Sequence, residues 1–497
     1  MILKEIINQV NIKKIYGDYD IDISNIAFNS KKIKEKGLFI AIPGFKEDGL
    51  SFIEDAVKNG AICIVAQKQP NIEKITEKYI AQIIVSDSRQ ALAKISSNFF
   101  GKPSERLNLT GITGTNGKTT TAFLIDSILK AANKKTSIIT TIESFILRNK
   151  IDFGRTTPES LEINEFLQNS LKELCSYCTM EVSSHAVDLH RVDYINFKTL
   201  VFTNLSQDHL DYHKDMLTYF NVKKKLFTDY ESKIFKAENA VINEDDYHGK
   251  ILLKETNLNK ISYSINSKNS DLKASDIKLD TSGIKMNIVF KDNSAIKINS
   301  YLTGYFNVYN ILAASGAAIA MGFSPADIAK GVESLKGVNG RFEKISEIND
   351  FTAIVDYAHT PDGLDNVIKT AKRILKPGSK LITVFGCGGD RDRTKRKIMG
   401  EIAGKMSDYI FITSDNPRTE DPLSIISMIE EGVRKYNTGR YNKIEDRKTA
   451  IDEALNFAGR DDIVLIAGKG HENYQEFNGF RIDFSDQETV RKWAKKQ

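Results

Sequence analysis

The sequence lacks the features that would attach a protein to a membrane or carry it across one. No apolar run approaches the roughly 18 residues that a membrane-spanning helix needs. The N-terminal segment MILKEIINQVNIKKIYG is amphipathic and has too few apolar residues for a signal peptide. No polybasic run stands out, although the formal net charge is +5. We therefore expect a cytoplasmic protein whose main partner is neither a membrane nor nucleic acid.

Cysteine is also scarce. The four cysteines are Cys63, Cys175, Cys178 and Cys387. This small number is typical of reduced thiols in a cytoplasmic protein. Cys175 and Cys178 form a C-x-x-C pair, but no second pair follows at the spacing of a zinc site. We therefore predict ordinary thiols near the start of a strand.

The chain is long enough for several domains. At roughly 150 residues per domain, a length of 497 residues suggests about three. Hydrophobic residues make up 41% of the chain and charged residues 27%, so each domain can bury a core. The polar segment GKPSER at 101–106 is typical of a linker, and a strand–helix pattern restarts near residue 337. We expect three α/β domains, at 1–100, 101–336 and 337–497.

A glycine-rich turn follows the first strand of the expected central domain. The alternating segment LNLTGIT predicts a strand, and TTAFLIDSILKAA has helical apolar spacing. Backbone N–H groups between such a strand and helix hold phosphates. Lys118 would reach the β- and γ-phosphates, and the Thr119 hydroxyl would bind Mg²⁺, although Ile112 stands where the strict P-loop motif has its first glycine. The expected ATP-binding residues of this turn are Gly114, Thr115, Asn116, Gly117, Lys118, Thr119 and Thr120.

Several further strands end in polar clusters. In the central domain SYCTMEVSS and FKTLVFTNLS change from apolar to polar, and after residue 337 the segments FTAIVDYAH, KLITVFGCGGD, SDYIFITSDNPR and DDIVLIAGKGHE do the same. Ligands of parallel α/β sheets bind at the carboxyl ends of the strands. The pattern therefore predicts a mostly parallel central sheet and a second doubly wound, Rossmann-like domain, each with a site at that edge.

Nine motifs in order carry a family resemblance. They are GITGTNGKTTT, MEVSSHAVDLHRV, FTNLSQDHLDYHKDM, GYFNVYNILAA, GRFE, VDYAHTPDGL, GCGGDRDRTKR, DNPRTE and AGKGHENYQ. Together they resemble the Mur ligases, and within them the UDP-N-acetylmuramoyl-tripeptide synthetases, over almost the whole chain. The resemblance implies an ATP-dependent, ADP-forming ligase of peptidoglycan synthesis. It also implies a small N-terminal domain for the UDP sugar, a central ATP domain and a C-terminal domain for the incoming amino acid.

The resemblance implies two Mg²⁺ ions and a carbamylated lysine. Glu181 would bind one ion and His209 the other, and the family motif Y-F-x-A-K-x-x-L-F aligns its modified lysine with Lys223. Carbamylation turns this cation into a carboxylate-like oxygen ligand. Val222 replaces the usual small residue, and the neighbouring lysines are typical of a solvated helix face. The expected catalytic residues are therefore Lys118, Glu181, His209 and Lys223.

Substrate contacts are also implied by the resemblance. Further ATP-site residues would be Asn307, Arg341 and His359, with Arg341 at the hinge where domain closure excludes water. The UDP-dipeptide would contact Ser30, Thr156, Thr157, Ser183 and Arg191. In the first domain this chain reads Asn29-Ser30-Lys31 where the family usually reads D-S-R. We expect a monomer.

The segment DNPR marks the meso-diaminopimelate enzymes of the family. A second amino-carboxylate end on the substrate needs an arginine fork for its carboxylate and acidic groups for its ammonium. Lysine has no second carboxylate, whereas the isostere meso-lanthionine does, so the sequence leaves both diamino diacids open. The expected pocket residues are Arg391, Asp415, Asn416, Pro417, Arg418, Gly468 and Glu472.

Three other functions compete with this interpretation. A folylpolyglutamate synthetase would belong to the same superfamily, but the DNPR segment and the full-length first domain argue against it. A P-loop motor or switch predicts basic patches and aromatic stacking platforms, which the sequence lacks. A binding module without catalysis leaves Glu181, His209 and Lys223 unexplained.

Overall fold

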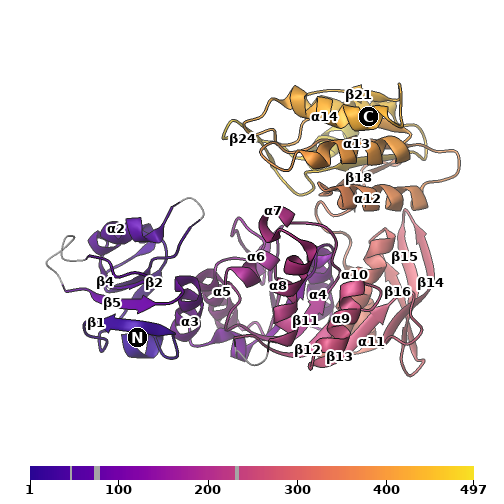
Figure 1. Cartoon of the computed structure of the whole chain (residues 1–497). Coiled ribbons are helices and arrows are strands. Elements are labelled where there is room, and N and C mark those ends of the chain that lie inside the picture. The colour runs from indigo at the N-terminus through magenta and orange to yellow at the C-terminus, as the bar shows by residue number, and fades with distance from the viewer. Residues whose placement is uncertain (45–46, 72–78, 230–233, 497) are drawn as a thin grey trace.

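The computed structural model describes residues 1–44, 47–71, 79–229 and 234–496. Three bodies follow one another along the chain, each built around its own sheet (Figure 1). The N-terminal body lies beside the central one, and the C-terminal body lies above it. The predicted fold class, α/β with a mostly parallel central sheet, is confirmed. None of the described helices is long and apolar enough to cross a membrane.

The N-terminal sheet has the strand order β1-β5-β4-β3-β2. Its strands are β1 (Ile12–Tyr16), β2 (Asn25–Ala27), β3 (Gly37–Ile40), β4 (Ala61–Ala66) and β5 (Ala81–Val85). Only β1 pairs antiparallel among these described strands. Its helices are α1 (Leu3–Ile6), α2 (Ile53–Lys58) and α3 (Ser88–Phe99). Nearly all residues of β3 and β4 are buried, which shows that both faces of the sheet are covered at these strands. This explains their continuous apolar sequences, since a parallel strand in the middle of a sheet is apolar on both sides.

The central sheet joins eleven strands of the described chain, in the order β16-β15-β14-β13-β12-β11-β6-β10-β7-β8-β9. The parallel middle consists of β6 (Asn108–Thr113), β7 (Thr136–Ile139), β10 (Tyr177–Glu181), β11 (Asn196–Phe202), β12 (Lys236–Asn243), β13 (Asn259–Ser264) and the start of β14 (Leu272–Asp280). Antiparallel edges are formed by β8 (Ser144–Ile146), β9 (Asn149–Ile151), β15 (Gly283–Phe290) and β16 (Ala295–Ser300). The carboxyl ends of β6, β10 and β11 therefore meet at one edge.

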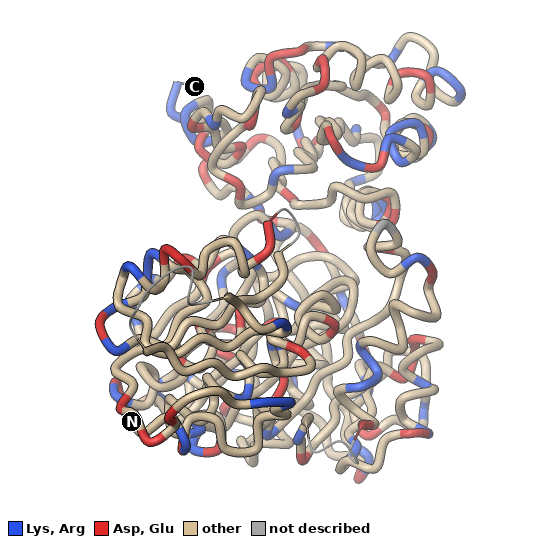
Figure 2. Tube along the Cα trace, turned by 60° about the vertical axis from the view of Figure 1, so that its left-hand side comes forward, with Lys and Arg blue, Asp and Glu red and all other residues tan. Residues whose placement is uncertain are grey.

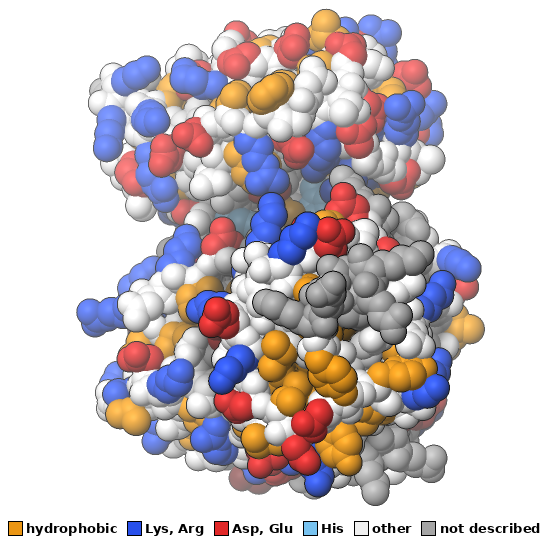
Figure 3. Space-filling view, turned by 90° about the vertical axis from the view of Figure 1, so that its left-hand side faces the viewer, with side chains coloured by type: hydrophobic (Ala, Val, Ile, Leu, Met, Phe, Trp, Pro, Cys, Tyr) orange, Lys and Arg blue, Asp and Glu red, His pale blue; other side chains and the backbone are white. Residues whose placement is uncertain are grey.

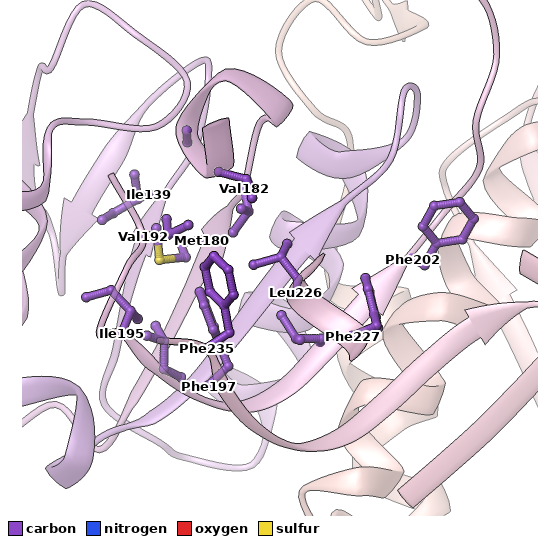
Figure 4. Packing of buried hydrophobic residues seen from close by; sticks show 14 of the residues in the cluster. Ile139, Met180, Val182, Val192, Ile195, Phe197, Phe202, Leu226, Phe227 and Phe235 are labelled. Carbon is purple, nitrogen blue, oxygen red and sulfur yellow. The ribbon is translucent and has the colours of Figure 1, made fainter. Parts of the chain in front are cut away.

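Alternating side chains of these strands build two cores. On one face they pack against α4 (Lys118–Ala131), α10 (Tyr305–Ala320) and α11 (Pro325–Ser334). On the other they pack against α5 (Ser160–Lys172), α6 (Ser184–Asp188), α8 (Met216–Thr228) and α9 (Tyr247–Glu255). Figure 4 shows part of this second core, where Phe197 from β11 lies near Phe235 and Leu226 of α8 packs beside Phe227. The packing holds α8 against the sheet edge that carries the glycine-rich turn.

The C-terminal sheet has the order β17-β18-β22-β19-β20-β21. Its strands are β17 (Glu343–Lys344), β18 (Thr352–Asp356), β19 (Leu381–Phe385), β20 (Tyr409–Ile412), β21 (Tyr441–Lys443) and β22 (Ile463–Ala467). One face carries α12 (Pro361–Ile374), α13 (Thr394–Met406) and α14 (Pro422–Arg434), and the other α15 (Arg447–Phe457) and α16 (Asp486–Ala494). The four apolar segments predicted to be strands are β18, β19, β20 and β22. A hairpin of β23 (Tyr474–Phe477) and β24 (Phe480–Asp483) follows.

The four cysteines are free and buried, in agreement with the prediction of ordinary thiols. Burial raises the pKa of the Cys178 thiol to about 12. A buried thiol with a raised pKa is a poor nucleophile and a poor metal ligand.

Candidate functional site

The glycine-rich turn lies between β6 and α4. Gly114 has a φ of +144° and Gly117 a φ of +85°, a region of the backbone that favours glycine. A Cβ atom at Gly114 would lie 2.0 Å from the Thr203 hydroxyl, and one at Gly117 would lie 2.3 Å from Asn310 Oδ1. Both positions therefore require glycine. The first turn of α4 presents its free N–H groups at this place, which suits an anion.

Two lysines converge on one carbonyl oxygen of the turn. Lys118 Nζ donates to Gly114 O (3.0 Å) and to Thr115 O (2.8 Å). Lys223, which is 1% exposed on α8, donates from its Nζ to the same Gly114 O (3.0 Å). Its ammonium also lies 4.7 Å from the centre of the Tyr219 ring. The structure thus brings the predicted phosphate-binding lysine and the predicted modified lysine to one point.

The electrostatics of these lysines follow from burial. Burial and the positive charge of Lys118 hold the pKa of Lys223 well below its usual range. Burial also lowers the pKa of Lys118, while the carboxylates of Glu181 and Asp208 favour its charged form. Negative charge at this place would therefore favour the charged form of Lys118, and a phosphate group bound at the turn would supply it.

Glu181 ends β10 and is buried beside the turn. Thr141 donates from its backbone N–H to Oε1 (2.9 Å) and from its hydroxyl to Oε2 (3.0 Å) of this carboxylate. The Thr141 hydroxyl also lies 3.0 Å from that of Thr156. Thr141 was missed by the sequence analysis, although it follows β7, and the rule that polar residues at strand ends build sites would have indicated it.

Three of the residues expected to contact the UDP-dipeptide form one network. The Thr157 hydroxyl donates to Glu181 O (2.9 Å) and accepts from Ser183 N (3.1 Å). Arg191 donates from Nη1 to Thr157 O (3.1 Å) and pairs with Glu159 (2.9 Å). Thr156 joins this network through Thr141, so the structure brings together all of the predicted dipeptide residues of the central body.

Glu159 is a further residue that the sequence analysis missed. Its buried carboxylate pairs with Arg191, with Arg155 (2.9 Å) and with Arg89 (3.3 Å) of the N-terminal body. Ser30 lies apart from this network, at the start of a short helix in the N-terminal body, where its carbonyl accepts a hydrogen bond from Asn59. Nothing in the sequence around Glu159 distinguished it from an ordinary surface carboxylate.

His209 lies on the loop after β11, next to Asp208. Its Nε2 is 3.4 Å from the Asp208 carboxylate, and its ring packs edge-on against the rings of His185 (4.9 Å) and Tyr219 (6.1 Å). The Tyr219 hydroxyl is 3.2 Å from that of Thr115. His209 is therefore connected to the glycine-rich turn through an aromatic ring.

The oxygen atoms at the turn that could bind Mg²⁺ are too few to hold the ion without phosphate oxygens. Across the described residues, no group of three or more His, Cys, Asp or Glu side chains could hold a metal ion by itself. Mg²⁺ is usually bound by one or two carboxylates together with substrate phosphates and water. The Thr119 hydroxyl and the Glu181 carboxylate beside the turn fit that pattern.

Residues of the C-terminal body contact the turn directly. Arg341 donates from Nη2 to the Thr119 hydroxyl (3.3 Å), and its guanidinium lies 4.8 Å from the centre of the Tyr357 ring. Asp362 Oδ2 accepts from Asn116 Nδ2 (3.2 Å) and from the Ser206 hydroxyl (2.9 Å). Asp362 was missed, because its motif also occurs at ordinary helix starts and only the tertiary fold places it against the turn.

The other residues expected at the ATP site have mixed environments. Asn307 is buried, donates to Thr303 O (2.7 Å) and accepts from Asn310 (2.8 Å), so both of its polar groups bond within the protein. It supports Asn310, which packs against Gly117. Thr120 is likewise buried, on α4 behind the turn. His359 is exposed, with Nδ1 2.9 Å from Tyr357 O.

The carboxyl ends of the C-terminal strands form a second polar cluster. Asp415 and Asn416 follow β20, and Asn416 Nδ2 donates to Glu472 Oε2 (2.8 Å). Gly468 follows β22 with a φ of +119°, and a Cβ there would lie 2.6 Å from Asp415 Oδ2. Lys469 Nζ donates to the same Glu472 Oε2 (2.9 Å). Lys469 was missed, although it lies inside the predicted motif.

Arg418 lies at the edge of this cluster. It has a φ of +53°, donates from Nη1 to Gly389 O (2.8 Å), and its Nε lies 3.4 Å from the Glu476 carboxylate. A Cβ at Gly388 would lie 3.0 Å from Arg418 Nη1 and 3.9 Å from Arg391 Cγ, so the two arginines flank one glycine. A Cβ at the next residue, Gly389, would lie 1.9 Å from the carbonyl oxygen of Pro417. The predicted amino-acid residues therefore lie in one place.

Charge is spread over the whole molecule, with both signs interspersed along all three bodies (Figure 2). In the space-filling view a hollow separates the C-terminal body from the rest, and Lys, Arg and His side chains lie at its edge (Figure 3). The contacts of Arg341 and Asp362 with the turn cross between these bodies. The arrangement suits a reaction between a nucleotide held by the central body and a small substrate held by the C-terminal body.

Three comparisons with known proteins agree with this arrangement. The Mur ligase family catalytic domain matches residues 22–100, the Mur ligase middle domain matches 112–318, and the glutamate ligase domain of Mur ligases matches 340–470. Two curated relatives are named UDP-N-acetylmuramoyl-L-alanyl-D-glutamate--2,6-diaminopimelate ligase. The one from Clostridium tetani is 45% identical and covers 99% of both chains, and the one from Alkaliphilus oremlandii is 42% identical over 100% of this chain and 99% of its own.

The solved structures extend the likeness. A structure of a ligase with the same name has a TM-score of 0.71 and 31% identity, covering 100% of this chain and 99% of its own. A folylpolyglutamate synthase from Mycobacterium tuberculosis has a TM-score of 0.61 at 16% identity, covering 76% of this chain and 92% of its own, which shows a shared fold alone. On these matches, the chain belongs to the Mur ligase family.

Proposed function

We propose that this chain is an ATP-dependent, ADP-forming ligase that adds meso-diaminopimelate to UDP-N-acetylmuramoyl-L-alanyl-D-glutamate in cytoplasmic peptidoglycan precursor synthesis. The observation that carries the proposal is the contact of Arg341 and Asp362 with the glycine-rich turn, because it joins a phosphate site to an amino-acid site. Relatives that are 42% and 45% identical over the full chain carry the name of this ligase. In the proposal, 1–100 binds the UDP sugar, 101–336 binds ATP and 337–497 binds the amino acid.

In the proposed reaction, ATP phosphorylates the γ-carboxylate of the D-glutamate residue. The amine of the incoming amino acid attacks the acyl phosphate, a tetrahedral intermediate forms, and phosphate leaves. The N–H groups of the turn and Lys118 would hold the transferred phosphoryl group, and most of the rate enhancement would come from positioning and charge. Arg341 contacts both bodies, so closure over the reactive acyl phosphate would exclude water.

Bound Mg²⁺ would neutralise the charge that spreads over the phosphoryl oxygens. Thr119 and Glu181 would hold one ion together with phosphate oxygens. His209 and a carbamylated Lys223 would hold a second. Burial and the positive charge of Lys118 lower the pKa of Lys223, and this favours the neutral amine, which is the form that reacts with carbon dioxide. A carbamate there would also place a negative charge beside Lys118.

The dipeptide end of the nucleotide substrate would lie along the network of Thr156, Thr157, Ser183 and Arg191. Hydroxyl groups and an arginine suit a ligand rich in carboxylate and amide groups. Arg191 is paired with Glu159, so its guanidinium is held in place before substrate binds. Ser30 would contact the uridine end, and the protein would act as a monomer.

The incoming amino acid has a second amino-carboxylate end, whose charged groups are called distal because they lie away from the reacting amine. Arg418 and Arg391 would bind the distal carboxylate. The distal ammonium would be bound by Asp415, Asn416 and Glu472. This pocket recognises the termini, so meso-lanthionine would also fit. The test is ADP formation with ATP, the UDP-dipeptide and each candidate amino acid in turn. Stimulation by meso-diaminopimelate supports the proposal, whereas ADP formation that needs a folate and glutamate would refute it.

A further inference from the structure

Lys469 is a fully enclosed charged residue at the centre of the C-terminal cluster. Its side chain is 0% exposed, and its Nζ bonds to Glu472 Oε2 (2.9 Å) and Asn416 Oδ1 (3.1 Å). Asp415 Oδ1 lies 3.9 Å away. A buried ammonium is costly unless it is paired and hydrogen-bonded, so this contact set stabilises both the lysine and the two carboxylates.

The contacts of Lys469 orient the groups that face a ligand. Both the Lys469 ammonium and Asn416 Nδ2 donate to Glu472 Oε2, and no hydrogen bond from the described residues reaches Oε1. Asn416 Oδ1 accepts from Lys469 and from Glu476 N (3.0 Å), which sets the direction of its amide. One oxygen of Glu472 is therefore anchored, and the other is left for an incoming ammonium.

Lys469 also sets the charge of this subsite. Asp415 and Glu472 carry two negative charges, and the ammonium of Lys469 cancels one of them. The remaining single negative charge matches one incoming ammonium. Without Lys469 the subsite would attract a bare ammonium more strongly and would repel a carboxylate beside it.

On the basis of the proposed function, we propose that Lys469 is a positioning residue that determines amino-acid specificity. By holding Glu472 and Asn416 and neutralising one of the two carboxylates, it makes the pocket favour an amino-carboxylate end over a single ammonium. Lys469 acts through these neighbours and need not touch the substrate. Arg418 attracts the distal carboxylate, while Lys469 limits the attraction for a ligand that has only the ammonium.

The experiment replaces Lys469 with methionine, which keeps the length of the side chain and removes its charge. The ratio of kcat/KM for meso-diaminopimelate to that for lysine should fall at least roughly tenfold, because one unit charge is removed 2.9 Å from the Glu472 carboxylate that would bind the ligand. The change should appear in the KM for the amino acid. The KM values for ATP and for the UDP-dipeptide should stay as they are.

Three further variants separate charge from folding. Lys469→Arg keeps the charge and should retain most of the ratio. The double variant Lys469→Met/Glu472→Gln removes one charge of each sign and leaves no unpaired carboxylate at Glu472. Its ratio should be higher than that of Lys469→Met and close to that of the unmutated enzyme. Lys376→Met is the matched control, since this exposed lysine of the same body pairs with Asp461 (2.6 Å) on the surface.

An unchanged ratio in folded Lys469→Met would overturn the inference, and so would an equal loss with both amino acids. If Lys469→Met does not fold, the double variant decides. A ratio in the double variant far below that of the unmutated enzyme then refutes the charge argument, and a ratio close to it supports the argument. Failure of the unmutated enzyme to use meso-diaminopimelate would instead refute the proposed function.

Discussion

Arg418→Ala should remove the preference for a diamino diacid while leaving the fold intact. The guanidinium donates to Gly389 O and lies 3.4 Å from the Glu476 carboxylate, which leaves it at the pocket edge where a distal carboxylate would bind. Loss of a charge-assisted arginine–carboxylate pair in a closed site costs about 2–5 kcal/mol. This corresponds to a fall in kcat/KM for meso-diaminopimelate of roughly 30-fold to several thousand-fold.

The effect on stability should be much smaller. The Arg418 side chain is 21% exposed and its partner Glu476 is 24% exposed. A partly exposed pair of this kind contributes about 1 kcal/mol or less, so the melting temperature should change by only a few degrees. A large loss of activity with a small change in melting temperature would show that Arg418 serves binding.

The assay is ADP release with the UDP-dipeptide and either meso-diaminopimelate, meso-lanthionine or lysine. Arg418→Lys should also lose most of the preference for a diamino diacid, because an ammonium cannot form the bidentate contact that a guanidinium makes with a carboxylate. Arg434→Ala is a matched control, since the exposed side chain of Arg434 pairs with Glu430 of the same helix, α14. The reasoning is refuted if lysine matches the diamino diacids in the unmutated enzyme, or if Arg418→Ala keeps its kcat/KM within about threefold.

Three further predictions concern the turn and the core. Lys223→Ala should lose most ADP formation, and added acetate should restore part of it by filling the position of the carbamate. An unmodified Lys223 that points to solvent in electron density obtained at high bicarbonate would contradict this. Gly117→Ala should abolish ADP formation. Gly378→Ala is the control, because Gly378 has the same φ of +85° but nothing lies within 4 Å of the added atom, so this variant should lose only stability. Equal activity in both variants would show that the turn tolerates a side chain. Arg447→Met should lower the free energy of unfolding by about 3–5 kcal/mol, because it leaves the fully buried Asp486 unpaired. Chemical denaturation measures this, and an unchanged midpoint would exclude a structural role for the pair.

The sequence alone determined the elements whose signals are local. The strand–turn–helix around Gly114 and Gly117 was predicted because alternation, glycine spacing and helical periodicity all occur within about twenty residues. The four C-terminal strands were recognised in the same way, since each is an apolar run that ends in a polar motif. The family followed from the order of nine motifs, which does not require knowing how they pack.

Only the tertiary structure showed which of these residues share partners. Gly114 O accepts from Lys223, which is 109 positions away, and Asn116 contacts Asp362, which is 246 positions away. Such contacts depend on the order of strands in the sheets, because strand order decides which loops meet at one edge, and no local pattern encodes that order. The lowered pKa of Lys223 has the same origin, since it arises from burial and from Lys118 on another helix. Lys469 shows the reason most plainly: its motif was visible in the sequence, but only the fold surrounds its ammonium with Asp415, Asn416 and Glu472.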